Sequence, residues 1–171
     1  MLLIVGNLIA LIASILMVYS GILKEKKKIL FVQTIQIGLS VISNIVLGGI
    51  TGAIINGISM IRNIICYKDK LGLKEKIIIT VLSVVLSIIV NNLGVIGFLP
   101  VISTIAYIWL MNIKDVKKFK LLIIFTMFMW FIYDFTIKSY TSAIFDILTI
   151  ISNMISLVHV KNKLKYNKKV V

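Results

Sequence analysis

The sequence predicts an all-α integral membrane protein with seven transmembrane helices. The chain has 171 residues, of which 60% are hydrophobic, and its mean hydropathy is +1.08. A soluble domain of this size would expose far too much apolar surface with such a composition. The chain also offers several long apolar runs, and about 20 apolar residues are needed to cross a bilayer. Lysine-rich segments separate these runs, as topology signals do.

The apolar spans are assigned in chain order from their hydropathy and their polar borders. They cover residues 2–23, 29–47, 50–67, 77–93, 95–113, 121–137 and 140–160. In the first span, small residues recur at about helical spacing, which would let a neighbouring helix pack closely. These residues are Gly6, Ala10, Ala13 and Ser14.

Short breaks separate some of the spans. Gly48 and Gly49 form a tight turn after the second span, because glycine adopts the backbone angles that such a turn needs. Lys138 and Ser139 form a short turn after the sixth span. Pro100, near the start of the fifth span, either occupies the first helical turn or kinks the helix. The basic tail, residues 161–171, is expected to fray.

The distribution of positive charge predicts the orientation in the membrane. With the N-terminus outside and the C-terminus inside, every Lys and Arg except Lys138 falls at the inner face. This distribution follows the positive-inside rule. The net charge of +13 therefore predicts contact with anionic lipid headgroups, and not nucleic-acid binding.

Residues 24–63 resemble residues 114–153 without a gap. Nine of the forty aligned residues are identical, and rare polar residues coincide: Asn44 meets Asp134 and Asn56 meets Asp146. The chain therefore divides into a first three-helix repeat (1–68), a basic loop and linker helix (69–94), a second three-helix repeat (95–160) and the basic tail. An odd number of spans in each repeat, with one linker helix between them, makes the repeats parallel, and parallel repeats often frame a central site.

This 3+1+3 plan resembles the superfamily of SWEET, PQ-loop and PnuC small-solute carriers. Within it, the segments KKKILFVQ and LGGITGAIINGISMIRNIICY are similar to the YgjV family of bacterial inner-membrane proteins. The family motif runs from Gly48 to Asn63 as G-x-x-T-G-A-x-x-N-x-x-x-x-x-R-N. The resemblance implies a location in the bacterial cytoplasmic membrane, and it carries no assigned activity. Pro100 has no counterpart in the first span, where Ala10 stands, and the chain has no Pro-Gln dipeptide.

Polar residues inside the spans are the candidate solute ligands. Asn56, Ser59 and Asn63 share one face of the third span, and Asp146, Thr149 and Asn153 share one face of the seventh. Because lipid penalises such stripes, we expect both to face inward across the pseudo-two-fold axis and to line a polar cavity. The resemblance to SWEET-like carriers implies a pocket asparagine on the third helix of each repeat. Either Asn56 with Asp146 or Asn63 with Asn153 fits that position.

Asp146 and four further side chains each allow more than one role. Asp134 either reaches interfacial water or joins the site, and Asp146 must face the interior, pair with a cation or carry a proton. Arg62 either snorkels to the inner headgroups or pairs with an acid or an anionic group. Trp130 and Tyr133 either wall the cavity or pack.

The sequence shows no catalytic constellation, no metal-spaced His or Cys cluster and no phosphate loop. We therefore expect no enzyme activity, metal or cofactor. The first functional hypothesis is a carrier or facilitator for a small polar solute, with proton coupling through Asp146 as an option. The alternative is a non-transporting membrane scaffold or partner subunit in which the polar residues hold the helices together. The oligomeric state, including a homo-oligomer, stays open.

Overall fold

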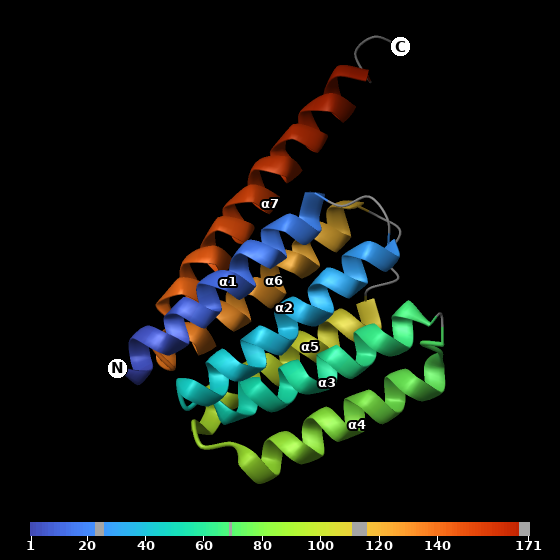
Figure 1. Cartoon of the computed structure of the whole chain (residues 1–171). Helices are drawn as coiled ribbons and strands as arrows, with labels where there is room; N and C mark the ends of the chain where they lie inside the picture. Colours follow the sequence, from blue (N-terminus) through green and yellow to red (C-terminus); the bar gives the residue numbers. More distant parts are fainter. Residues whose placement is uncertain (23–25, 69, 111–115, 168–171) are drawn as a thin grey trace.

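The computed structural model describes residues 1–22, 26–68, 70–110 and 116–167. Within these ranges the chain forms seven α-helices and one 3-10 helix, and no strand. Figure 1 shows them in chain order. They are α1 (Leu2–Ile22), α2 (Lys26–Val46), α3 (Ile50–Tyr67), α4 (Leu73–Val90), η1 (Gly94–Phe98), α5 (Leu99–Leu110), α6 (Val116–Thr136) and α7 (Tyr140–Asn167).

Several helix boundaries differ from those expected. Helix α4 begins at Leu73 instead of 77, because the Glu75 carboxylate accepts a hydrogen bond of 2.9 Å from the Gly72 N–H and caps the helix. The expected fifth span begins with η1, so Pro100 lies in the first turn of α5, where proline is tolerated. Helix α7 continues to Asn167, which corrects the expectation of a frayed tail from residue 161.

Some expectations fall outside the described residues. They concern the end of the first span at 23, the end of the fifth at 113, and parts of the loops and tail at 24–25, 69, 114–115 and 168–171. Among the described residues, two helices are long and apolar enough by themselves to cross a membrane, Leu2–Ser20 and Ile50–Tyr67. Three shorter apolar helical segments accompany them: Leu30–Val46, Gly94–Leu110 and Tyr140–Ile155.

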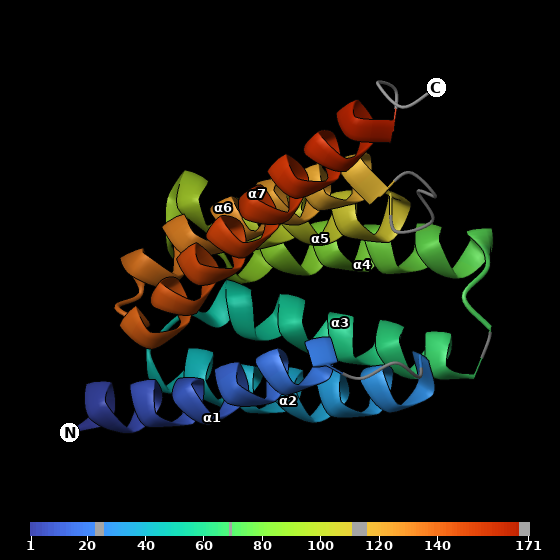
Figure 2. The ribbon, with the colours of Figure 1, turned by 90° about the horizontal axis from the view of Figure 1, so that it is seen from above.

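The helices pack as neighbours along the chain. Helix α1 packs on α2 and α2 on α3, and likewise α5 packs on α6 and α6 on α7. Helix α4 contacts both α3 and α5, and α1 contacts α7. In Figure 2, α1 to α3 lie on one side of the molecule and α4 to α7 on the other. We call the end with the α2–α3 and α6–α7 turns the turn end, and the opposite end, which carries Lys28, Lys68, Lys70 and Lys118, the basic end.

Many apolar side chains face outward, while several hydroxyl side chains are buried. Helix α4 buries Ser83 and Ser87 completely, while apolar side chains such as Ile88 (62% exposed) and Ile89 (72% exposed) point outward. In α1, the small residues Gly6, Ala10, Ala13 and Ser14 are buried, as expected for close helix packing. An apolar surface of this extent needs lipid around it.

The two hairpins share one backbone geometry at an offset of 90 residues. Helix α2 begins at 26 and α6 at 116; they end at 46 and 136; α3 and α7 begin at 50 and 140. In the first turn, Gly49 N donates to Asn44 O at 2.7 Å, and in the second, Ser139 N donates to Asp134 O at 2.8 Å. Gly48 and Lys138, 90 positions apart, both have positive φ, 79° and 62°.

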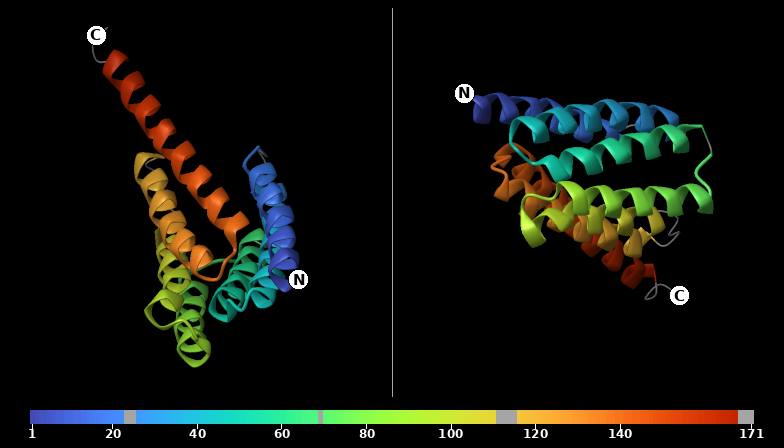
Figure 3. Two further views of the ribbon diagram at one scale, coloured as in Figure 1. Left: turned by 90° about the vertical axis from the view of Figure 1, so that its left-hand side faces the viewer. Right: turned by 90° about the horizontal axis from the view of Figure 1, so that it is seen from below.

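Helices α1 and α7 meet at one end and diverge at the other. They lie close at the turn end, where Asn7 of α1 contacts the α6–α7 turn. Figure 2 and the left view of Figure 3 both show them separating toward the basic end. Helices α1 and α7 are therefore joined at the turn end and apart at the basic end.

Candidate functional site

A cavity of about 220 Å³ lies between helices α1 to α3 and helices α5 to α7. Its lining comes from α1, α2, α3, α5, α6 and α7 and is rich in hydroxyl and amide groups. The lining residues are Ser14, Met17, Gln33, Gln36, Ile37, Ser40, Ser43, Asn44, Asn56, Ser59, Arg62, Ser103, Thr104, Tyr107, Thr126, Met127, Trp130, Asp134, Ser142, Phe145 and Asp146. A polar cavity within an apolar exterior is suited to a polar ligand.

Fourteen of these residues form seven pairs whose members stand 90 positions apart. The pairs are Ser14 with Thr104, Met17 with Tyr107, Gln36 with Thr126, Ile37 with Met127, Ser40 with Trp130, Asn44 with Asp134, and Asn56 with Asp146. The cavity is therefore built from equivalent positions of the two aligned segments, and the pairs differ mainly in chemistry.

Two carboxyl groups form the acidic part of the cavity. Asp134 of α6 is 6% exposed and Asp146 of α7 is 7% exposed. The two groups lie close enough to influence each other electrostatically. Among the described residues, no donor reaches Asp146 Oδ2, which is fully buried. We call Asp134 and Asp146 the acid pair.

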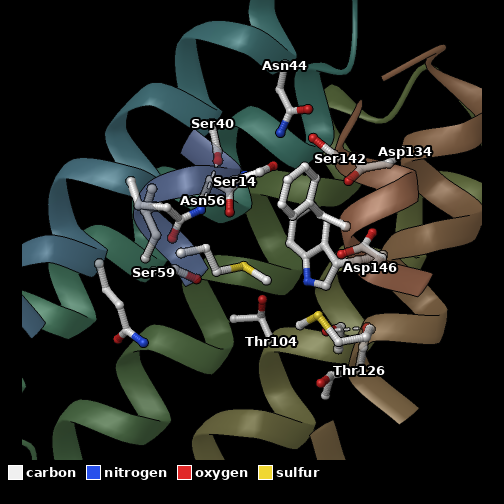
Figure 4. Close-up of a pocket in the computed structure, with 18 of the residues that line it drawn as sticks. Ser14, Ser40, Asn44, Asn56, Ser59, Thr104, Thr126, Asp134, Ser142 and Asp146 are labelled. Carbon is white, nitrogen blue, oxygen red and sulfur yellow. Dashed lines mark hydrogen bonds between the residues drawn. The ribbon is translucent and has the colours of Figure 1, made fainter. Parts of the chain in front are cut away.

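The first half of the cavity carries an amide pair in the equivalent place. Asn44 on α2 and Asn56 on α3 align with Asp134 and Asp146, and all four line the cavity. Figure 4 shows the two asparagines and the two aspartates coming from different helices toward one space. The cavity thus sets neutral amides opposite groups that can carry charge.

Arg62 lines the cavity nearer to the basic end than the acid pair does. It lies six residues after Asn56 on α3, which corresponds to about 9 Å along the helix axis toward the basic end. The side chain is 8% exposed, so it does not snorkel. Its Nε and Nη2 donate to Asn63 Oδ1 at 3.2 and 2.9 Å, and its guanidinium carbon lies 5.3 Å from the centre of the Tyr107 ring.

Side-chain contacts join the two sides of the bundle at the turn end. The Tyr133 hydroxyl accepts a hydrogen bond of 2.7 Å from Gly52 N–H, one of the N–H groups that the first turn of α3 leaves without a helical partner. The Tyr133 ring packs so closely on α3 that a Cβ on Gly52 would lie 2.5 Å from it. Asn7 Nδ2 donates to Lys138 O, and Asn7 Oδ1 accepts from Thr141 N–H, both at 3.0 Å.

Comparison with known proteins identifies the family of the chain. A family model described as a bacterial inner membrane protein, Imp-YgjV, matches residues 4–163. The chain belongs to the YgjV family. Its helices therefore belong to a protein of the bacterial inner membrane, in agreement with the apolar exterior. Searches of curated proteins and of solved structures find no match.

The structure brings some of the expected site residues of this YgjV-family chain into the cavity. Those that line it are Asn56, Ser59, Arg62, Trp130, Asp134 and Asp146. Asn63, Tyr133, Thr149 and Asn153 do not. Of the two asparagine positions left open by the sequence, the one with Asn56 and Asp146 faces the cavity. A role in solute binding stays a prediction for all of these residues.

The two polar side chains of the α7 stripe that lie outside the cavity bond locally. The Thr149 hydroxyl donates to Phe145 O at 2.8 Å, and Asn153 Nδ2 donates to Thr149 O at 2.8 Å. Such bonds to the preceding helical turn satisfy a polar side chain without a partner helix. The expected stripe on α7 therefore reaches the cavity only through Asp146.

Sequence reasoning missed the contribution of α2. Gln33, Gln36, Ser40 and Asn44 line the cavity, and their spacing of three to four residues places them on one helix face. Thr126, four residues before Trp130 on α6, was also missed. The signal is present in the sequence, because the polar stripe on α2 has the same helical spacing as the stripe on α3.

Proposed function

We propose that this YgjV-family protein is a carrier or facilitator for a small polar solute. The observation that carries the proposal is the cavity itself, which lies between the two three-helix groups and holds buried charged groups of both. Charged side chains are costly inside a bilayer, and those that occur there usually mark a path for a solute or a proton. Oppositely charged residues that served only packing would be expected to form ion pairs with each other across the helices.

We also propose that the helices form a 3+1+3 arrangement of parallel repeats, with the N-terminus outside. Two observations support it: the common offset of 90 residues in helix boundaries and turns, and the seven equivalent pairs in the cavity. With that orientation the basic end rests on anionic headgroups of the inner leaflet. The cavity then lies on the pseudo-two-fold axis, as in other transporters built from repeats.

The contacts around the cavity favour alternating access. Hydrogen bonds and close packing join the two halves at the turn end, whereas α1 and α7 diverge toward the basic end (Figure 3). In the proposed orientation, these contacts favour a state closed to the outside. Transport then requires the turn-end contacts to break while contacts form at the basic end.

The scaffold alternative predicts a different arrangement of the polar stripes. In a scaffold, the stripes on α3 and α7 would hydrogen-bond to each other and leave no cavity. Among the described residues, Asn63 bonds to Arg62 of its own helix, and Thr149 and Asn153 bond within α7. This pattern favours the carrier.

The test is binding and flux with purified protein. A panel of small polar metabolites is first screened by thermal shift, and compounds that stabilise the protein are then followed into proteoliposomes. We expect at least one compound to cross faster than in empty liposomes and Asp146→Ala to abolish this flux. Absence of any ligand and any flux, or an undiminished flux in Asp146→Ala, would count against the carrier.

A further inference from the structure

We propose that the solute is a small zwitterion, with an ammonium group at one end and an anionic group at the other. The ammonium binds at the acid pair, Asp134 and Asp146, and the anionic group binds at Arg62. This inference rests on the proposed carrier function and names its substrate class.

The acid pair has the features of an ammonium site. Both carboxyl groups are more than nine-tenths buried, and Asp146 Oδ2 has no donor among the described residues. A buried carboxylate is stabilised by a cation with N–H donors, and an ammonium supplies three of them. Trp130 stands four residues before Asp134 on α6 and lines the same cavity, so an aromatic ring lies near the place where a cation binds.

Arg62 has the features of an anion site. The hydrogen bonds to Asn63 use two of its five N–H donors. Among the described residues, the ionisable groups that act on it are Tyr107 and Cys66, and neither is a carboxylate. A guanidinium binds carboxylate or phosphate oxygens through paired hydrogen bonds.

The two charged regions together select a ligand that carries both charges. Inside a bilayer, Coulomb interactions are several times stronger than in water. A simple amine would therefore be attracted by the acid pair and repelled by Arg62. A simple carboxylate would be attracted by Arg62 and repelled by the acid pair. A neutral polyol would leave both regions without a charged partner. A zwitterion is attracted at both ends.

The spacing of the two regions favours separated charges. Asp146 aligns with Asn56, and Arg62 lies about 9 Å farther along α3. The Arg62 guanidinium is held beside Asn63 and Tyr107, so the ligand has to bridge the distance to the acid pair. An amino acid with its two groups at opposite ends of a short chain therefore fits better than glycine. The cavity, about 220 Å³, is smaller than the roughly 300–1,000 Å³ of drug-sized sites, which limits the ligand to a small metabolite.

Calorimetric titration of the full chain in lipid nanodiscs tests the ligand class. The zwitterions are glycine, β-alanine, 4-aminobutanoate and 5-aminopentanoate; butylamine and butanoate carry one charge each, and xylitol carries none. We expect 4-aminobutanoate or 5-aminopentanoate to bind at least tenfold more tightly than glycine, butylamine, butanoate and xylitol.

Variants then assign the two ends of the ligand. Asp146→Asn and Arg62→Gln should each weaken binding of the best zwitterion at least tenfold. Asp146→Asn should not weaken butanoate, and Arg62→Gln should not weaken butylamine. Glu75→Gln is the matched control, because it removes a carboxylate outside the cavity and keeps an oxygen that can accept from Gly72 N–H. If Arg62→Gln does not fold, Arg62→Lys replaces it, and a loss of at least threefold is expected.

The outcomes separate this inference from the carrier function. If xylitol binds and no zwitterion does, or if butylamine binds as tightly as the best zwitterion, the substrate class is wrong and the carrier function stands. The same holds if Arg62→Gln binds the zwitterion with unchanged affinity. If no probe binds and the wider metabolite panel gives no flux, both proposals fall.

Discussion

At the scale of single residues, the two halves of the cavity differ by amide and carboxyl side chains that have nearly the same shape but differ in charge. Asn44 and Asn56 have nearly the same shape as Asp134 and Asp146, yet an amide stays neutral and a carboxyl group can ionise. Equivalent backbones hold the two pairs. The asymmetry of the site is therefore chemical and leaves the helix geometry unchanged.

The double variant Asp134→Asn with Asp146→Asn separates function from packing. Burying ionised carboxylates is costly, so replacing both by amides of nearly the same shape should not lower stability. We expect the variant to unfold in detergent at the same temperature as the natural chain or higher, while flux is lost. Thermal unfolding followed by circular dichroism and a liposome flux assay make the two measurements. Lower stability with retained flux would assign the acid pair a structural role.

Tyr133 provides a second test at this scale. Its hydroxyl accepts from the Gly52 N–H in a fully buried place, so Tyr133→Phe leaves that donor without a partner. We expect a loss of about 1–3 kcal/mol in the free energy of unfolding, the usual cost of an unsatisfied buried donor. Denaturant titration measures this loss. Tyr140→Phe, at a side chain 45% exposed, is the control and should change little; equal losses in the two variants would contradict the capping role.

At the scale of helices and turns, the two hairpins use different residues for the same backbone. Gly48 has a φ of 79° with open space around it, and Lys138 holds the equivalent position with a φ of 62°. A left-handed conformation costs a side-chain-bearing residue about 1–2 kcal/mol relative to glycine. The second turn therefore carries a strain that the first avoids.

Opposite substitutions at these positions should have opposite effects. Gly48→Ala should lower the free energy of unfolding by about 1 kcal/mol, because the space is open and only the backbone is strained. Lys138→Gly should raise it by up to about 1 kcal/mol, less the greater entropy of glycine in the unfolded chain. Denaturant titration of both variants gives the signs. Two shifts of the same sign would show that the turns are not equivalent.

Many of the helix borders and turns could be predicted from the sequence. The hairpin turns, the start of α3 at Ile50 and that of α7 at Tyr140 agree with the expected borders, because glycine and abrupt changes in polarity mark them. The 3-10 segment before α5 was not foreseen, since an apolar run gives no signal of helix type. The early start of α4 was missed because its first turn is charged, although Glu75 at the third helical position is a capping signal.

The site was predictable in part for a similar reason. Polar residues deep in apolar spans stand out, so Asn56, Asp146 and Arg62 could be found. What the sequence could not decide is which polar residues bond within their own helix. Asn153 and Thr149 do so, and this depends on side-chain conformations that a helical stripe does not specify.

At the scale of the whole molecule, the proposed carrier must separate its halves at the turn end. The Asn7 side chain reaches Thr141 N at 3.0 Å, so a cysteine pair at these two positions tests whether the helices part here; a disulfide needs Cα atoms about 4.4–6.8 Å apart. In a Cys66→Ser background, Asn7→Cys with Thr141→Cys should crosslink under oxidant. We expect oxidation to abolish flux and a reductant to restore it. The Asn7→Cys single variant should not respond, and full flux in the crosslinked protein would contradict alternating access.

The acid pair and Arg62 lie at different depths, so the cavity is not the same when approached from its two ends. A solute arriving from one side meets the carboxyl groups first, and one arriving from the other side meets the guanidinium. Half-saturation concentrations should therefore differ between inward and outward flux. Detailed balance nevertheless requires uncoupled flux to end at equal concentrations on both sides. Accumulation against a gradient would show that a second species, such as a proton, travels with the solute or against it.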